Sequence, residues 1–225
     1  MRMRRKKNLE ERLASFDNII LIPRVTDDHR SIVAEKEYID FSELFGNSNP
    51  VHMEIGCGKG QFMFELAKRT PDINYIAVEV NESVISDACK KAKEAGITNV
   101  IFMKCGAEIL SKYIKPASIG KLYLNFSCPL PKKANENRRL TNVRFLEIYK
   151  EFLTPDAEIH QKTDNMHFFE YSIEQYTLAG FKLKNISLDL HNSNFEGNIV
   201  TEYERKFSSA GMPIYRLEAY MQPNT

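Results

Sequence analysis

The 225-residue chain lacks any long hydrophobic run, since its apolar stretches extend over only a few residues. A helix that crosses a bilayer needs about 20 consecutive apolar residues, so the sequence predicts no membrane association. The basic start MRMRRKK resembles the first part of a signal peptide, but no apolar segment follows it. We therefore expect a cytoplasmic protein. Apolar residues still make up 43% of the chain, which is enough for a globular core.

Closely spaced cysteines are also absent. The four cysteines, Cys57, Cys89, Cys105 and Cys128, are scattered singly, with no C-x-x-C pair. Zinc sites and disulfide frameworks use clustered cysteines, so the sequence predicts reduced thiols and no metal.

The chain also has almost no excess of positive over negative charge, because its 31 Lys and Arg residues are balanced by 30 Asp and Glu residues. Bulk charge therefore does not predict a nucleic-acid partner, but local charge does. Two basic clusters stand out: Arg2, Arg4, Arg5, Lys6 and Lys7, and then Lys132, Lys133, Arg138 and Arg139. Such clusters are suited to phosphate contacts, although either one alone could be a solvated tail or loop.

Hydrophobic patterning predicts an α/β domain. Strand patterns occur at 51–56, 74–80, 99–105, 121–126, 157–163, 181–190 and 213–221, and helical patterns at 61–69, 83–96, 142–153 and 167–180. Strands that alternate with helices indicate a mainly parallel sheet with helices on both faces. The last two strands lack a regular helix between them, so we expect an antiparallel pair at the end. Residues 1–45 form a predicted basic extension with a short helix near 9–16, and 46–225 the main domain.

The first strand ends in EIGCGKG, residues 54–60. Ligands of such sheets bind outside the carboxyl ends of the strands, where glycines let the backbone approach closely. Position 61 is Gln61, not the glycine of a dinucleotide fingerprint, and no P-loop spacing occurs. Glu79 ends the next strand and is placed to accept hydrogen bonds from a ribose diol. Together these features predict a nucleoside site.

EIGCGKG followed by VEV resembles the S-adenosylmethionine (SAM) pocket of class I methyltransferases. The resemblance implies a Rossmann-like sheet of roughly seven strands with a reversed last strand, and SAM as the cofactor. It also implies a cofactor site made of Glu54, Gly56 and Gly58 at the methionine end, Glu79 at the ribose, and Cys105 and Gly106 at the adenine.

Three later segments narrow the resemblance: YLNFSCPLPKK with RRLT (123–141), HQKTDN (160–165) and FEGNIVTEYERKFSSAG (195–211). Together they resemble the bacterial tRNA (guanine-N7-)-methyltransferase family over nearly the whole chain. This implies methyl transfer from SAM to N7 of a guanine in the tRNA variable loop, by a monomer or homodimer. The implied substrate residues are Lys132, Asp164, Thr201 and Glu204, and the expected contacts to the RNA backbone are Arg2, Arg4, Arg5, Lys133, Arg138 and Arg139. Carboxylates such as Asp164 and Glu204 suit the N–H donors of guanine, but they could equally be surface acids, and Thr201 a helix cap.

The sequence departs from the family pattern at the place of the catalytic aspartate, which is Cys128. Leu130 stands for a tryptophan, Asn135 for a histidine, and Cys105 for an acidic residue near the adenine. A neutral thiol cannot replace a carboxylate as a hydrogen-bond acceptor. Guanine N7 has an exposed lone pair and no proton, so the transfer requires alignment and no general base.

Two hypotheses therefore stand. The chain is either an active tRNA guanine-N7 methyltransferase, or a relative that binds RNA, with or without SAM, and does not methylate it. A methyltransferase for a small molecule or protein would explain the cofactor half only, and not the basic clusters or the later motifs.

Overall fold

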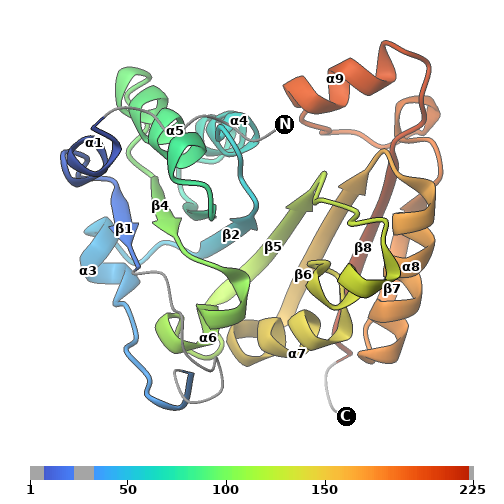
Figure 1. Cartoon of the computed structure of the whole chain (residues 1–225), viewed down its shortest axis with the longest axis horizontal. Coiled ribbons are helices and arrows are strands. Elements are labelled where there is room, and N and C mark those ends of the chain that lie inside the picture. Colours follow the sequence, from blue (N-terminus) through green and yellow to red (C-terminus); the bar gives the residue numbers. More distant parts are fainter. Residues whose placement is uncertain (1–7, 23–32, 223–225) are drawn as a thin grey trace.

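Eight strands of the described chain form one sheet in the order β1-β4-β3-β2-β5-β6-β8-β7 (Figure 1). A computed structural model of the protein describes residues 8–22 and 33–222. The strands are β1 (Ile19–Leu21), β2 (Val51–Ile55), β3 (Asn74–Val78), β4 (Val100–Lys104), β5 (Ile119–Asn125), β6 (Leu153–Thr163), β7 (Lys182–Ser187) and β8 (Tyr215–Tyr220). The pairs from β1 to β6 are parallel, whereas β8 runs antiparallel to β6 and β7. The predicted α/β fold with a reversed final strand is confirmed.

Helices cover both faces of the sheet (Figure 1). The first face carries α1 (Leu9–Ala14), α4 (Gln61–Arg69) and α5 (Glu82–Glu94), whose buried residues pack together in one cluster. The second face carries α3 (Phe41–Phe45), α6 (Leu110–Tyr113), α7 (Val143–Phe152) and α8 (Met166–Leu178), which pack in another. The short helix α9 (Glu202–Ser208) follows the last crossover. Three 3₁₀ turns complete the described elements: η1 (Ala107–Ile109), η2 (Lys133–Arg138) and η3 (Leu190–Asn192).

Asparagine side chains fix the start of three of these helices. Asn81 accepts hydrogen bonds from the backbone of residues 83 and 84 at α5, Asn142 caps α7, and Asn165 caps α8. A cap supplies an acceptor for amides that have no partner within the first turn of a helix. The four helices predicted from periodicity are all present, and side-chain caps fix the start of α5, α7 and α8 but not of α4, which begins after Gly60.

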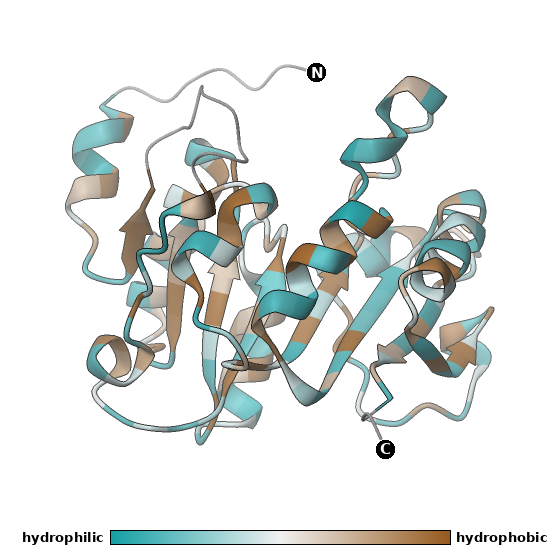
Figure 2. Ribbon diagram, turned by 90° about the horizontal axis from the view of Figure 1, so that it is seen from below, coloured by the Kyte–Doolittle hydropathy of each residue, from teal (hydrophilic) through white to brown (hydrophobic). Residues whose placement is uncertain are grey.

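Apolar residues concentrate on the central strands, and hydrophilic residues on the outer turns of the helices (Figure 2). Strand β3 is buried along its whole length, as expected for a parallel strand covered on both faces. Among the helices that the structure describes, none combines the length and the apolar character needed to cross a bilayer.

The described residues of the segment before residue 46 contribute a strand to the sheet and a helix to one of its faces. Helix α1 buries Leu9 and Leu13 beside α5, and β1 pairs in parallel with β4. Strand β1 was not predicted, because three residues are too few for an alternating pattern to emerge. Arg2, Arg4 and Arg5, predicted to contact RNA, lie outside the described residues.

Strands β1 and β7 are the two edges of the sheet. The pairing of β7 with β8 shifts register between Lys184 and Ser187, where Asn185 has a left-handed φ of 50°. Lys182 and Lys184 are exposed on this edge strand. The β7 edge is therefore irregular and carries exposed lysines.

Candidate active site

The loop after β2 has the conformation that its glycines were expected to provide. Gly56, Gly58 and Gly60 have φ values of 82°, 57° and 78°, a region that residues with side chains rarely adopt. A Cβ added at Gly60 would lie 2.6 Å from the ring of Phe64, so the entry into α4 also requires glycine. The amide of Gly58 donates to Glu79 Oε2 at 3.2 Å, which ties the loop to the end of β3.

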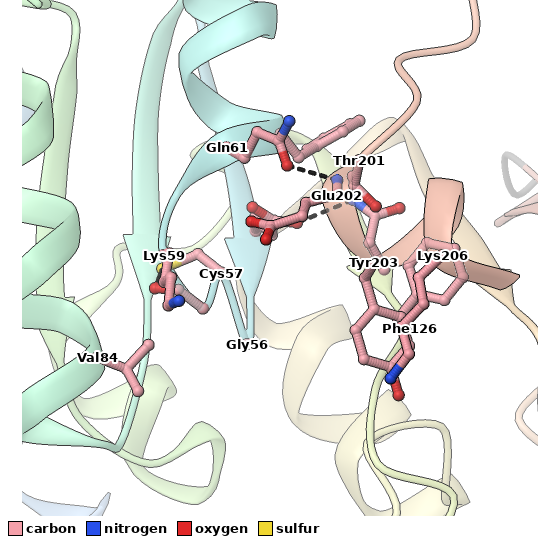
Figure 3. Close-up of a pocket in the computed structure, with 14 residues that line it drawn as sticks. Gly56, Cys57, Lys59, Gln61, Val84, Phe126, Thr201, Glu202, Tyr203 and Lys206 are labelled. Carbon is pink, nitrogen blue, oxygen red and sulfur yellow. Dashed lines mark hydrogen bonds between the residues drawn. The ribbon is translucent and has the colours of Figure 1, made fainter.

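A cavity of about 650 Å³ opens beside this loop, at the carboxyl ends of β2 and β5 (Figure 3). A cavity of this size is typical of a site for a cofactor-sized molecule. Its lining comes from the loop and α4 (Gly56, Cys57, Gly58, Lys59, Gln61 and Phe62), from α5 (Val84), from strand ends (Glu54, Asn125 and Phe126) and from the start of α9 (Thr201, Glu202, Tyr203 and Lys206). Two segments far apart in the sequence thus meet at one site.

Glu54 is a buried carboxylate in this lining, with only 2% of its surface exposed. Its Oε1 accepts a hydrogen bond from Asn125 Nδ2 at 2.9 Å, but its Oε2 has no partner in the described chain. Burial raises the pKa of Glu54 to about 7, although the Asn125 hydrogen bond and the Lys162 charge act in the opposite direction. An unpartnered carboxylate oxygen beside a glycine loop fits the ammonium group of the methionine part of SAM.

Three of the predicted cofactor residues are not part of the cavity lining: Glu79, Cys105 and Gly106. Glu79 accepts from the amides of Gly58 and Asn81, and a carboxylate has acceptor capacity left for a ribose diol. Cys105 is 5% exposed and packs in the core, where burial raises its pKa to about 12. The Cys105 side chain is therefore enclosed by the core, and its contact with the adenine end of the cofactor stays a prediction. Gly106, next to it, opens η1.

The loop that follows β5 carries Cys128, which is exposed. Two non-glycine residues of this loop have left-handed backbones, Phe126 at φ 51° and Leu130 at φ 43°. Each such residue costs on the order of 1 kcal/mol and persists only when its surroundings enforce it.

Arg139 supplies that enforcement for the second residue. Its Nε donates to the carbonyl oxygen of Pro129 at 2.9 Å and its Nη2 to that of Leu130 at 3.3 Å. Its guanidinium also stacks 4.2 Å from the ring centroid of Tyr171. Arg139 therefore braces the Cys128 loop, and the contact to RNA predicted for it stays a prediction.

Lys132, Lys133 and Arg138 lie at the outer end of the same loop and are exposed. Arg138 Nη1 lies 3.4 Å from Asn135 Oδ1, and η2 presents these cations beyond the loop. Their exposure leaves the predicted contacts open: Lys132 with the substrate, and Lys133 and Arg138 with the RNA backbone, stay predictions.

The three late substrate residues occupy different environments. Asp164 directly follows β6 and is half-buried. Thr201 lines the cavity and caps α9, because its Oγ1 accepts from the Glu204 amide at 3.0 Å.

Glu204, predicted to bind the substrate, is fully buried and is not part of the cavity lining. Its Oε2 accepts from Lys162 Nζ and its Oε1 from Asn198 Nδ2, both at 2.7 Å, and His191 Nε2 lies 3.1 Å away. Both oxygens are thus engaged by residues that support α9, and the contact of Glu204 with the guanine stays a prediction.

Sequence reasoning missed several residues of the site. Lys162 is one of them, because its burial at the end of the largely polar strand β6 leaves no signal in the sequence. Its Nζ also donates to the carbonyl of Ile199 at 2.9 Å and lies 5.4 Å from the ring centroid of Phe62. Gln61 was also missed; its Oε1 accepts from the Glu202 amide and so bridges α4 and α9 (Figure 3).

A separate cluster joins Glu158, His160 and Glu218 on β6 and β8, with ligand atoms within 4.8 Å of one another. Its carboxylates already have cationic partners, Lys184 and Lys121 at Glu158 and Arg216 at Glu218. Because these cations compensate the acidic charge, we assign no metal to the cluster.

Comparisons with known proteins agree with the geometry. The sequence profile of a family described as "Putative methyltransferase" matches residues 48–217. A tRNA (guanine-N(7)-)-methyltransferase of Listeria monocytogenes is 46% identical over 224 residues, covering 100% of both chains. One of Streptococcus pneumoniae is 45% identical over 220 residues, covering 97% of this chain and 99% of the relative.

Solved structures support the fold. The 16S rRNA methyltransferase KamB superposes with a TM-score of 0.61 at 18% identity, covering 84% of this chain and 96% of that one. A SAM-dependent methyltransferase from Aquifex aeolicus gives 0.55 at 14% identity, covering 86% and 98%. With full-length relatives at this level of identity, a matching family profile and a SAM-type cavity, the chain belongs to the tRNA (guanine-N7-)-methyltransferase family.

Proposed function

We propose that this protein transfers the methyl group of SAM to N7 of a guanine in the variable loop of tRNA. One observation carries the proposal: a single cavity joins the unpartnered oxygen of Glu54 to the start of α9, where the T-x-x-E motif of the family stands. Its relatives in Listeria and Streptococcus bear the name of this activity.

Each part of the chain has a distinct task in this proposal. SAM, when bound, supplies an electrophilic methyl group on a sulfonium. Glu54 and the glycine loop hold its methionine end, and Glu79 accepts from its ribose. Lys132, Lys133 and Arg138 contact the tRNA backbone.

Alignment of the base then replaces acid–base chemistry. Guanine N7 needs no proton removed, so the protein lowers the barrier by holding N7 in line with the methyl group. Asp164, at the end of β6, accepts from the N–H groups of the base, and Thr201 lines the cavity. The carboxylate usual at position 128 in the family is absent here, and the braced Cys128 loop serves to limit the space around the base.

The second candidate is a relative that binds RNA without methylating it. Cys128 is the observation in its favour, because a neutral thiol cannot accept hydrogen bonds as an aspartate does.

Methyl transfer distinguishes the two candidates. SAM labelled in its methyl group would be incubated with an unmodified tRNA transcript, and the product mapped by chain cleavage at N7-methylguanine. We expect label at one variable-loop guanine, and none in a transcript with adenine at that position.

The Cys128→Asp and Cys128→Ala variants would be assayed beside the natural chain. Label from the natural chain and from Cys128→Ala would show that the side chain is dispensable. Label from Cys128→Asp alone would establish the RNA-binding alternative, and no label from any variant that still binds SAM would contradict the proposed activity.

A further inference from the structure

An exposed aromatic side chain borders the cavity on the side opposite the glycine loop. Tyr203, on α9, lines the cavity and is 50% exposed. Its ring centroid lies 5.2 Å from that of Phe126, which also lines the cavity. Figure 3 shows both rings across the cavity from Gly56, Cys57 and Lys59. We call Phe126 and Tyr203 the aromatic shelf.

Both members of the shelf are held in place by the protein. Phe126 has a left-handed backbone and a side chain 5.9 Å from the buried ammonium of Lys162. Tyr203 packs on Phe207 of the same helix, with ring centroids 4.8 Å apart. The shelf therefore presents a fixed apolar surface to the cavity.

The surroundings of the shelf are those of an acceptor base. Burial raises the pKa of Tyr203, and the negative charge of Asp164 adds to this effect. Lys206, one turn further along α9, also lines the cavity and can meet a phosphate. These three groups suit an unstacked nucleotide: the aromatic ring can stack on its base, the carboxylate can accept from the N–H groups of the base, and the cation can bind its phosphate.

We infer that the aromatic shelf is the stacking surface for the nucleobase that is methylated, with Tyr203 in direct contact. This inference rests on the proposed function. Stacking on the shelf would set the base opposite the glycine loop, where the methyl donor is held. The shelf would also take the place of the aromatic ring that the family pattern has at position 130. This chain has Leu130 there and contains no tryptophan at all.

The alternative for Tyr203 is packing alone, as a support for α9. The two roles respond differently to substitution. Leucine at 203 keeps apolar contact with Phe126 and Phe207 but offers no π face, whereas phenylalanine and tryptophan keep the face and lose the hydroxyl. Tyr38, 41% exposed in the segment before α3, gives a matched control as Tyr38→Leu.

The test combines turnover with a binding signal that needs no turnover. Steady-state methyl transfer to tRNA would be measured for Tyr203→Leu, Tyr203→Phe, Tyr203→Trp and Tyr38→Leu. Binding would be followed with a transcript carrying fluorescent 2-aminopurine in place of the target guanine, because stacking on an aromatic ring quenches its emission. SAM affinity and thermal unfolding of each variant complete the set.

We expect Tyr203→Leu to lower kcat/KM for tRNA about tenfold or more, from the usual contribution of base–aromatic stacking. Tyr203→Phe and Tyr203→Trp should stay within about threefold of the natural chain. Quenching should be present in these two and lost in Tyr203→Leu, while SAM affinity is unchanged in all four.

The inferred stacking role of the shelf is contradicted if Tyr203→Leu keeps both turnover and quenching. It is also overturned if leucine and phenylalanine at 203 impair the enzyme equally, or if SAM affinity falls in parallel. If the natural chain transfers no methyl group, the proposed activity fails, yet a difference in quenching between the natural chain and Tyr203→Leu still supports the shelf.

Discussion

At the scale of single residues, Glu54 combines burial with incomplete hydrogen bonding. One oxygen accepts from Asn125 and the other has no partner in the described chain. Since burial raises its pKa to about 7, the group is close to half protonated at neutral pH before a ligand binds. A cationic ligand that meets the free oxygen favours the ionised form.

SAM affinity should therefore depend on pH through Glu54. Below pH 7 the carboxyl is protonated and must release its proton when SAM binds, so affinity should fall as pH falls, by at most about tenfold per unit. Above pH 7 this dependence should vanish. Calorimetric titrations in buffers of different ionisation enthalpy would count the released protons.

Glu54→Gln supplies the control, because glutamine cannot release a proton. This variant should bind SAM more weakly and without the step in affinity near pH 7. An identical pH profile for the two proteins would show that Glu54 does not meet the cation.

At the scale of elements, β6 and α9 are joined through one buried ion pair. Lys162, on β6, has its Nζ 2.7 Å from Glu204 Oε2, and both side chains are almost inaccessible to solvent. Lys162 also donates to Asn198 Oδ1 at 3.1 Å, within the segment that leads into α9. The cavity wall made by Thr201 and Tyr203 thus depends on a contact beneath it.

Removing one partner of this pair should destabilise the protein more than removing both. Lys162→Met leaves a buried carboxylate without its cation, and the free energy of unfolding should fall by about 3–5 kcal/mol. The double variant Lys162→Met with Glu204→Leu should recover a large part of that loss. Urea unfolding of both measures the difference.

Lys90→Met, at the exposed Lys90–Glu94 pair on α5, is the matched control and should cost far less. Equal stability losses at Lys90 and Lys162 would show that the buried pair has no special role.

The elements were predictable to different degrees, for physical reasons. Longer strands and helices carry a periodic pattern, and the glycine loop and Glu79 could be placed together because parallel strands end at one edge. The position of Glu204 could not be predicted, because its burial depends on Lys162, 42 residues away, and on His191. The bracing by Arg139 likewise depends on the conformation of Leu130, which no sequence pattern encodes.

At the scale of the whole molecule, the formal net charge of +1 gives little general attraction for a polyanion. Recognition of tRNA must then depend on local charge. Lys132 and Lys133 are exposed at the outer end of the Cys128 loop. In contrast, the guanidinium of Arg139 is engaged with two carbonyl oxygens.

Salt dependence should separate these cations. For Lys132→Ala with Lys133→Ala, the slope of log affinity for tRNA against log salt should decrease by about 0.7–0.9 per lost phosphate contact. Filter binding of tRNA over a range of KCl concentrations would measure it.

Arg139→Gln removes a charge from the same loop and serves as the comparison. It should slow methyl transfer by loosening the loop around Leu130 but leave the salt slope unchanged. A reduced slope in Arg139→Gln, or an unchanged one in the double lysine variant, would reverse the assignment of these residues.

The two edges of the sheet limit how copies of the molecule can meet. An edge strand exposes unpaired backbone groups onto which a strand from another chain can add. Here β1 offers only three residues, and β7 is interrupted at Asn185 and contains the exposed Lys182 and Lys184. Continuation of the sheet from one molecule into the next is therefore disfavoured at both ends of the described sheet, so any contact between copies has to use side chains and not strand pairing.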